Sequence, residues 1–222
     1  ELVEMINKKI RQYSLSKTNK EGYLKFREDY NNDPDPLSLY VLVSYSYNYQ
    51  IRFNNSMEFN NPFGKDRSSF SQNMEKNLRA FVDKLNNIDA EFTDVFFDEY
   101  DISLLSKDDF VYMDPPYLIT TGNYNDGNRG FVNWGEEQEK KMYQIMDSLT
   151  NKGVKWALSN VLEHKDKTNV LLKTYINNHE NIYVEHLKYT YKNSSYNTKR
   201  RFSDEVLITN YDPGNWRTDR LF

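Results

Sequence analysis

Short apolar runs alternate with amphipathic stretches through the second half of the chain, and this alternation restricts the possible folds more than any other feature. It predicts strands over residues 93–97, 109–113, 154–158, 181–187 and 205–209, and helices over residues 136–150 and 166–177. A chain of alternating strands and helices forms a mainly parallel sheet with helices on both faces. Ligands of such a sheet bind beyond the carboxyl ends of the strands, which is where Asp114 and Asn160 are expected.

The first half of the chain has helical periodicity instead. Apolar residues three and four positions apart predict two helices within residues 1–30 and another over residues 71–87. Thr18 followed by Glu21 predicts a capping box at the start of the second helix.

Residues 44–70 differ from both halves, because Asn, Tyr, Ser and Phe dominate there. Ile51-Arg52-Phe53 and Met57-Glu58-Phe59 flank an Asn54-Asn55-Ser56 turn, which predicts a β-hairpin. We therefore predict two domains: a helical domain over residues 1–90 with a hairpin near 50–64, and an α/β domain over residues 91–222.

Composition excludes several classes of protein. The 222 residues are 38% hydrophobic and contain no cysteine, so disulfides and thiolate metal sites are absent. No apolar run approaches the length of a membrane span, and a cytoplasmic protein is the default expectation. A net charge of −4 argues against a protein that coats nucleic acid, although a local basic face is enough to contact phosphates.

The strongest chemical signal is the motif Asp114-Pro115-Pro116-Tyr117, which follows the apolar run Phe110–Met113. Neither proline has an N–H group, so the strand must end in a stiff turn. A carboxylate, a carbonyl and an aromatic ring are then held together at the edge of the sheet. This set suits an exocyclic amine, because two acceptors take its N–H bonds while Tyr117 stacks on the ring. The alternative is a turn that merely ends a strand.

This motif resembles the catalytic motif of amino-methyltransferases that act on DNA. The string Ile51-Arg52-Phe53-Asn54, with Glu58-Phe59-Asn60 and Pro62-Phe63-Gly64-Lys65, is similar to the target-recognition hairpin of Dam-type adenine-N6 methyltransferases, phage-type members included. The order of recognition segment and catalytic motif is that of the alpha group. The resemblance implies a Rossmann-like methyltransferase sheet with an inserted helical and β-hairpin target-recognition domain.

The resemblance also implies roles for individual residues. Asp114, Pro115, Pro116 and Tyr117 would hold a flipped adenine, and Tyr100, Asp101 and Asp114 would contact S-adenosylmethionine. Arg52 would read a guanine, and the other implied DNA contacts are Tyr47, Asn48, Asn54, Pro62, Lys65, Lys199 and Arg200. The implied partner is double-stranded DNA at GATC or a GAT-like site, with no metal and no membrane, in a bacterial or phage-infected cell as part of DNA adenine methylation or restriction-modification.

One expected feature is missing from the sequence. The family's cofactor motif is a strand that ends in a glycine pair, and none of the eight glycines follows an apolar strand in this way. The sheet is therefore expected to be incomplete at its N-terminal side, with the motif upstream of Glu1 or on a second chain.

Several alternatives stay open at this point. A cytosine-N4 methyltransferase is one, although its motif more often begins with Ser than with Asp. A catalytically silent DNA-binding remnant is another. Arg52 could instead form a surface ion pair with Glu58, and the basic run 199–201 could simply be solvated.

Overall fold

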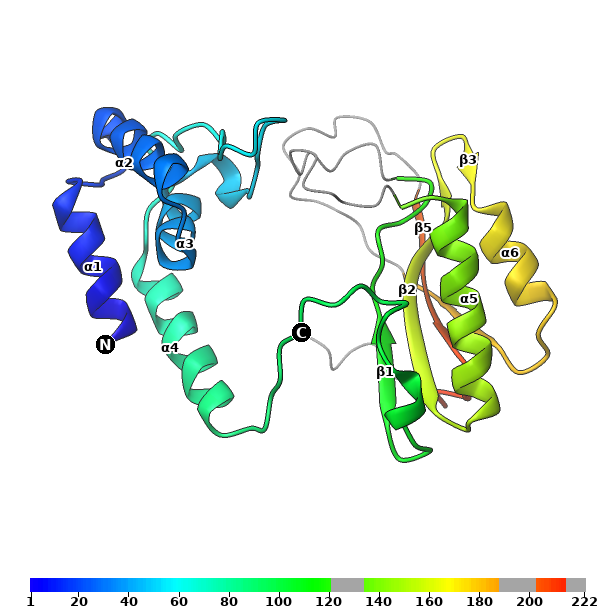
Figure 1. Cartoon of the computed structure of the whole chain (residues 1–222). Coiled ribbons are helices and arrows are strands. Elements are labelled where there is room, and N and C mark those ends of the chain that lie inside the picture. Colours follow the sequence, from blue (N-terminus) through cyan, green and yellow to red (C-terminus); the bar gives the residue numbers. More distant parts are fainter. Residues whose placement is uncertain (121–133, 188–202, 215–222) are drawn as a thin grey trace. The chain divides into compact units, whose positions relative to one another are not determined.

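The computed structural model describes residues 1–120, 134–187 and 203–214. These residues form two compact units, one of Glu1–Thr93 and one that begins at Asp94 (Figure 1).

The first unit is built from four α-helices, and side-chain caps fix where three of them begin. They are α1 (Leu2–Gln12), α2 (Lys20–Asn32), α3 (Pro36–Tyr45) and α4 (Gln72–Asn86). Asp35 accepts the Ser38 N–H at the start of α3, where Pro36 takes the first helical position, and Ser71 accepts the Met74 N–H at the start of α4.

The predicted Thr18–Glu21 capping box is wrong, because Asn19 caps α2 one residue later. Its Oδ1 accepts the Gly22 N–H at 3.0 Å, and its Nδ2 donates to the Ser14 carbonyl at 2.8 Å. Position 22 suits glycine, since a Cβ there would lie 2.2 Å from the Tyr13 carbonyl oxygen. Asn19 is the N-cap because its amide bonds both to the first turn of the helix and to the preceding turn of the chain.

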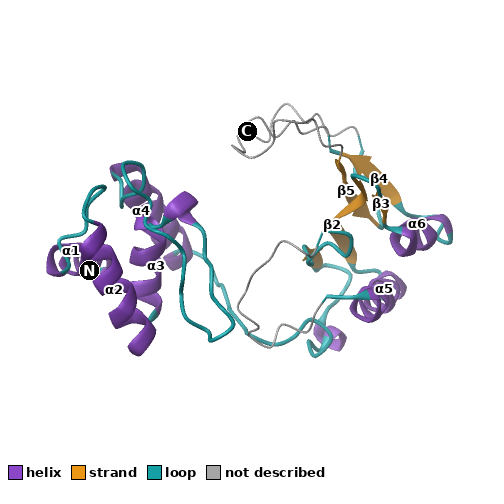
Figure 2. Ribbon diagram, turned by 90° about the horizontal axis from the view of Figure 1, so that it is seen from above, coloured by secondary structure: helices purple, strands orange, loops and turns teal. Residues whose placement is uncertain are grey.

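The core of this unit is formed by residues of α1, α2, α3 and the loop that follows them. Figure 2 shows these helices from above. α3 packs against both α1 and α2. The buried apolar residues are Ile6, Leu15, Tyr23, Phe26, Tyr30, Val41, Leu42, Tyr45, Phe53 and Phe59. The last two come from the loop, so that loop is part of the fold and not an appendage.

Residues 46–64, which we call the 46–64 loop, pair as the predicted hairpin over a short stretch only: across the Asn54–Ser56 turn, the Asn54 N–H donates to the Glu58 carbonyl at 2.9 Å and the Asn60 N–H to the Arg52 carbonyl at 3.0 Å. They contain the 3₁₀ turn η1 (Tyr47–Tyr49) and two isolated antiparallel bridges, Ser46 with Phe63 and Phe53 with Phe59. The Phe53 and Phe59 rings turn into the core and meet edge to face at 5.6 Å. Burial of these rings and the backbone hydrogen bonds at the two bridges together shape the loop.

The second unit contains a sheet of five strands. They are β1 (Phe110–Met113), β2 (Lys155–His164), β3 (Lys167–Thr168), β4 (Tyr183–His186) and β5 (Ser203–Thr209), in the order β1-β2-β5-β4 with β3 paired to β2. β1 is parallel to β2, and β5 is antiparallel to both of its neighbours. β1, β2 and β4 therefore point the same way. The predicted α/β class is confirmed, with a mixed sheet in the described residues.

Two helices, α5 (Glu136–Asn151) and α6 (Val170–Asn177), pack on one face of this sheet and on each other (Figures 1 and 2). This differs from the prediction of helices on both faces. The connections β1–α5–β2 and β2–α6–β4 advance in the same direction along the sheet, and right-handed crossovers then place both helices on the same side. Trp156, Leu158, Val206 and Ile208 form the buried sheet layer under them.

The strand predicted at 93–97 is wrong, since no strand forms there. Its aromatic residues pack instead: Phe97 lies 5.2 Å from the Trp134 ring, and Asp98 pairs with Lys141 at 2.9 Å. The short turn η2 (Ile102–Leu104) follows. β2 is longer than predicted, because beyond Leu158 it continues along β5 as far as His164.

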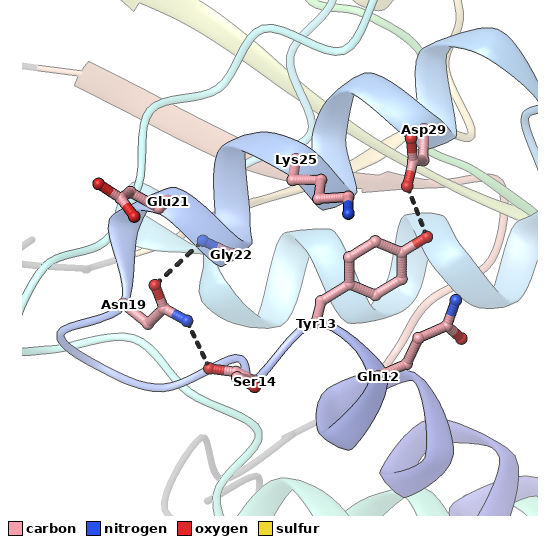
Figure 3. A pocket seen from close by; sticks show the side chains of 8 residues that line it. All are labelled: Gln12, Tyr13, Ser14, Asn19, Glu21, Gly22, Lys25 and Asp29. Carbon is pink, nitrogen blue, oxygen red and sulfur yellow. Dashed lines mark hydrogen bonds between the residues drawn. The ribbon is translucent and has the colours of Figure 1, made fainter.

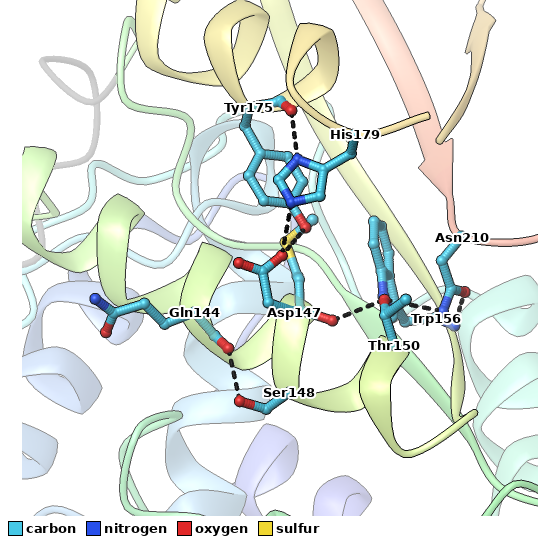
Figure 4. A network of polar contacts seen from close by, with 9 residues as sticks. Gln144, Asp147, Ser148, Thr150, Trp156, Tyr175, His179 and Asn210 are labelled. Atoms are coloured by element: carbon cyan, nitrogen blue, oxygen red, sulfur yellow. Dashed lines mark hydrogen bonds and ion pairs between the residues drawn. The ribbon is translucent and has the colours of Figure 1, made fainter. Parts of the chain in front are cut away.

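Polar contacts join α5 to α6 and to the strand β2 (Figure 4). Asp147 of α5 accepts the Tyr175 hydroxyl at 2.8 Å and lies 3.1 Å from His179 Nε2. The Trp156 indole donates to Thr150 Oγ1 at 2.8 Å. Among the described helices, none is long and apolar enough to cross a membrane.

Candidate active site and DNA-recognition loop

The motif Asp114-Pro115-Pro116-Tyr117 directly follows β1. The last register pair of β1 with β2 is Met113 with Leu158, and the chain then leaves the sheet. Asp114 is exposed, whereas Pro115, Pro116 and Tyr117 are partly buried. The sequence predicted a carboxylate and an aromatic ring just beyond the carboxyl end of a strand, and both lie there.

Tyr117 and Asp114 are joined by a hydrogen bond. The Tyr117 hydroxyl donates to Asp114 Oδ1 at 3.3 Å, and the Tyr117 carbonyl accepts the Thr120 N–H at 2.9 Å. Burial, then the negative charges of Asp114 and Glu205, raise the pKa of Tyr117 well above its ordinary value. The phenol is therefore neutral at physiological pH and available as a donor.

The sheet face beside the motif is polar and aromatic. Tyr112 of β1 is 58% exposed, and its hydroxyl lies 2.6 Å from Ser159 Oγ on β2. This contact links the two parallel strands next to the point where Asp114 emerges. An exposed carboxylate, oriented by a neutral phenol and supported by a rigid strand pair, can accept hydrogen bonds from a planar amine.

Tyr100 and Asp101, the predicted cofactor contacts, lie beside η2. Tyr100 is 47% exposed, and Asp101 Oδ1 accepts the Ser103 N–H at 2.9 Å. The hydrogen bonds from Ser103 lower the pKa of Asp101, so its carboxylate is ionised. Lys152, three residues before β2, donates to the carbonyls of Ile102 and Ser103. η2 therefore lies near the beginning of β1, whereas Asp114 follows its end.

A buried carboxylate that sequence reasoning missed lies under the sheet. Glu139 is fully buried and accepts from Trp134 Nε1 at 2.6 Å, Tyr143 Oη at 3.0 Å, and Asn160 and Asn169 Nδ2 at 3.3 Å. It thus joins the segment before α5, the strand β2 and the cap of α6. The sequence does contain one sign of this burial: Glu139 lies on the same face of the helix as Met142, Tyr143 and Met146.

In the 46–64 loop, Arg52 is exposed and Glu58 is bound elsewhere. Glu58 Oε2 accepts from Asn54 Nδ2 at 2.8 Å, and within the described residues no ion pair joins Arg52 to Glu58. The alternative of a surface ion pair between Arg52 and Glu58 is therefore not found among the described residues. Asn54 also accepts the N–H groups of Ser56 and Glu58 at 3.0 and 2.9 Å. The Asn54 side chain therefore stabilises the turn. A DNA contact of this side chain, as predicted, would compete with these hydrogen bonds.

The other predicted loop residues lie around η1. Asn48 and Lys65 are exposed, and the Tyr47 ring lies 5.1 Å from the Arg67 guanidinium. The Pro62 carbonyl accepts the Tyr47 N–H at 2.7 Å, which brings the two ends of the loop together. The structure thus gathers Tyr47, Asn48 and Pro62 on one part of the loop. Lys199 and Arg200 lie outside the described residues.

A pocket of about 480 Å³ lies elsewhere in the first unit, between the end of α1 and the start of α2 (Figure 3). It is lined in part by Tyr13, Asn19 and Asp29, and the Tyr13 hydroxyl donates to Asp29 at 2.8 Å. These side chains already bond to one another. Within the described residues no three His, Cys, Asp or Glu side chains gather closely enough to hold a metal ion.

An α/β sheet that carries Asp-Pro-Pro-Tyr at a strand end, together with a helical unit bearing a polar loop, defines the amino-methyltransferase class that the motif indicated. The family model for D12 class N6 adenine-specific DNA methyltransferases matches residues 1–191. The chain therefore belongs to the D12 class of N6 adenine-specific DNA methyltransferases. This confirms the family resemblance.

Modification methylases and a DNA adenine methylase are among the relatives. Modification methylase StsI of Streptococcus sanguinis is 57% identical over 95% of this chain and 32% of its own length. Type II methyltransferase M.FokI of Planomicrobium okeanokoites is 49% identical over the same shares. DNA adenine methylase of Escherichia coli K12 is 32% identical over 63% of this chain and 50% of its own length. The chain spans about a third of the length of the first two relatives.

Proposed function

We propose that this chain carries the recognition and catalytic parts of an enzyme that transfers a methyl group from S-adenosylmethionine to N6 of adenine in double-stranded DNA, at GATC or a GAT-like site. The single observation that carries the proposal is the placement of Asp114 and Tyr117 beyond the carboxyl end of β1, with a 3.3 Å hydrogen bond between them. An adenine that reaches them must be flipped out of the duplex, because its amine is otherwise paired.

The chain's residues act by positioning the amine. Tyr117 holds one oxygen of Asp114, and the carboxylate accepts one N–H of the adenine amine while the Pro115 carbonyl accepts the other. With both protons engaged, the nitrogen lone pair points away from the base plane toward the methyl donor. As the nitrogen–methyl bond forms, one amine proton passes by way of Asp114 to water, so no strong base is needed.

S-adenosylmethionine supplies an electrophilic methyl group and leaves as an uncharged thioether. The described residues fit part of such a site: Asp114 lies at the amine, and Asp101 is an ionised acceptor at η2. None of the glycines of the described residues directly follows a strand, so the glycine turn expected of the family is not among them. We propose Asp114 as the cofactor contact that this geometry supports. Tyr100 and Asp101 lie near the beginning of β1, so their proposed cofactor contacts rest on the family resemblance alone.

DNA binding is assigned to the 46–64 loop and to the basic run that contains Lys199 and Arg200. Arg52 is exposed and unpaired within the described residues, so its guanidinium is available to the O6 and N7 atoms of a guanine. Tyr47 and Pro62 meet in the same loop, next to Asn48 in the sequence, and Lys65 is suited to a phosphate. As in the relatives named modification methylases, a role in restriction-modification is the proposed setting.

Product analysis tests the proposal. The natural full-length polypeptide is incubated with labelled S-adenosylmethionine and duplexes that contain GAT, and the modified nucleosides are separated. N6-methyladenine is expected, and a duplex with every GAT changed to GGT should give none above background. N4-methylcytosine as the product would replace the adenine assignment. DNA binding without any methylated base would show a silent DNA-binding protein.

A further inference from the structure

The 46–64 loop contains a strained turn at its exposed end. Asn48 and Tyr49 both have φ of 55°, in the left-handed region that side chains rarely adopt. Both residues are exposed, so burial of their own side chains does not hold them there. Backbone strain of this kind persists only where the surrounding structure over-determines it, and it clusters at functional sites.

One buried side chain bonds to the backbone on both sides of the turn. Asn61 is 1% exposed, and its Nδ2 lies 3.0 Å from the Tyr47 carbonyl oxygen and 2.8 Å from the Gln50 carbonyl oxygen. These carbonyls stand immediately before and after the strained pair. The same nitrogen lies 2.8 Å from Ser46 Oγ, so two N–H groups serve three acceptors and one N–H is shared.

Asn61 is itself fixed to the helical core. Its backbone carbonyl accepts the hydroxyl of Tyr23, which is fully buried in α2, at 2.8 Å, and Arg27 Nη1 at 3.3 Å. Hydrogen bonds therefore connect α2 to Asn61, and Asn61 to both ends of the turn. This connection depends on an amide, because a carboxylate at position 61 would face two carbonyl oxygens without a proton to offer.

We propose that Asn61 is a positioning residue that determines DNA specificity without touching DNA. Its buried amide keeps the Asn48–Tyr49 turn in the left-handed conformation, and the turn in that conformation presents its side chains to the bases beside Arg52. The inference rests on the proposed function, in which the 46–64 loop reads DNA. It adds a buried positioning residue to the exposed residues that are proposed to contact the bases.

The positional part is tested without DNA, by hydrogen exchange on the Asn61→Asp variant. The Tyr47 and Tyr49 amides donate to Pro62 and Ser46 at 2.7 and 3.3 Å, so both report on the turn. They are expected to exchange about tenfold faster or more in the variant, while amides in the middle of α2 keep their rates. Unchanged exchange at Tyr47 and Tyr49 would overturn the proposal.

The functional part compares dissociation constants for duplexes in which a central GAT is kept or changed at one base. The specificity ratio is the dissociation constant for a changed duplex divided by that for the unchanged duplex. Asn61→Asp should reduce this ratio by about tenfold. The control Asn55→Asp adds the same charge to an exposed position of the same loop and should weaken all duplexes by one factor. A retained ratio in Asn61→Asp overturns the inference. If the wild type does not discriminate at all, the proposed function fails instead, and hydrogen exchange still decides the role of Asn61.

A double-mutant cycle covers the case in which Asn61→Asp does not fold. Tyr49→Gly relieves the left-handed strain, because glycine adopts positive φ freely. If Asn61 supports that strain, Asn61→Ala should change the unfolding equilibrium constant about fivefold less in the Tyr49→Gly background than in the wild type. Equal changes in both backgrounds would show that Asn61 does not act on the turn.

Discussion

At the scale of single residues, Asp114 makes the sharpest prediction. Its exposed carboxylate is bonded to Tyr117, and nothing in the proposal assigns it to phosphate binding. Asp114→Ala should abolish methyl transfer and leave DNA affinity within about tenfold, or about 1.4 kcal/mol. Labelled methyl transfer and fluorescence anisotropy on a GAT duplex measure the two effects. Substantial turnover by a folded Asp114→Ala enzyme would remove Asp114 from the catalytic role.

Arg52 predicts a different pattern, because a base reader and a phosphate contact respond differently to sequence and salt. Arg52→Ala should relax preference at one guanine by about 1–3 kcal/mol. Lys199→Ala should instead weaken all duplexes and flatten the salt dependence. Matched duplexes with single base changes, measured at two salt concentrations, separate these outcomes. An equal loss of affinity for every duplex in Arg52→Ala would make Arg52 a phosphate contact.

At the scale of elements, Glu139 joins α5 to β2 and α6. Glu139→Ala would leave four donors without their acceptor, three of them on buried side chains, at a cost of about 3 kcal/mol or more in the free energy of unfolding. The matched control on the same helix is Glu136→Ala, whose exposed pair with Lys140 is worth less than about 0.5 kcal/mol. Urea unfolding measures both. Similar losses in the two variants would contradict the bridging role of Glu139.

The contact of α5 with α6 predicts a dependence on alkaline pH. Burial, then the hydrogen bond to Asp147 and its charge, raise the pKa of Tyr175 above the ordinary 10.0. The phenol is protonated in the folded state, so its contribution is complete below the unfolded pKa and is lost as pH rises above it. Tyr175→Phe should cost about 1 kcal/mol near neutral pH. The difference from wild type should shrink between about pH 9 and about pH 11 in urea unfolding. A difference that stays constant would contradict the assignment.

Local signals predicted the elements of this chain better than they predicted its long-range contacts. The helix over 136–150 is found as α5 because its periodicity and its stop at Gly153 are local. The strand at 93–97 fails because its aromatic residues find a packing partner in Trp134 instead of a neighbouring strand. The Asp114 motif could be located from sequence, since two prolines must end a strand.

The buried polar residues could not be found in the same way. The burial of Glu139 depends on donors from β2 and from the cap of α6, up to 30 residues away. Asn61 depends on Tyr23, which lies 38 residues earlier in the chain. Neither partner is visible in a local window, and an Asn in a polar loop gives no sign that its amide is buried.

At the scale of the whole molecule, the residues that the structure describes form two separate hydrophobic cores. One gathers residues of α1, α2, α3 and the 46–64 loop, and the other gathers residues of α5, α6 and the sheet. The chain between them exposes its apolar side chains: Ile88 is 50% and Phe92 78% exposed. A connection without buried residues transmits little stabilisation, so each unit should unfold by its own transition.

Spectroscopic probes can separate the two transitions, because all three tryptophans follow Thr93 in the sequence whereas four of the described helices precede it. Phe26→Ala removes a ring that is 2% exposed and should destabilise the first unit by about 3–5 kcal/mol. Part of the far-ultraviolet circular dichroism should then be lost at lower urea while the tryptophan fluorescence transition stays in place. Leu172→Ala, in the second core, should move the fluorescence transition. If Phe26→Ala moves both transitions equally, the two cores unfold as one cooperative structure, and the exposed connection couples them more strongly than its burial implies.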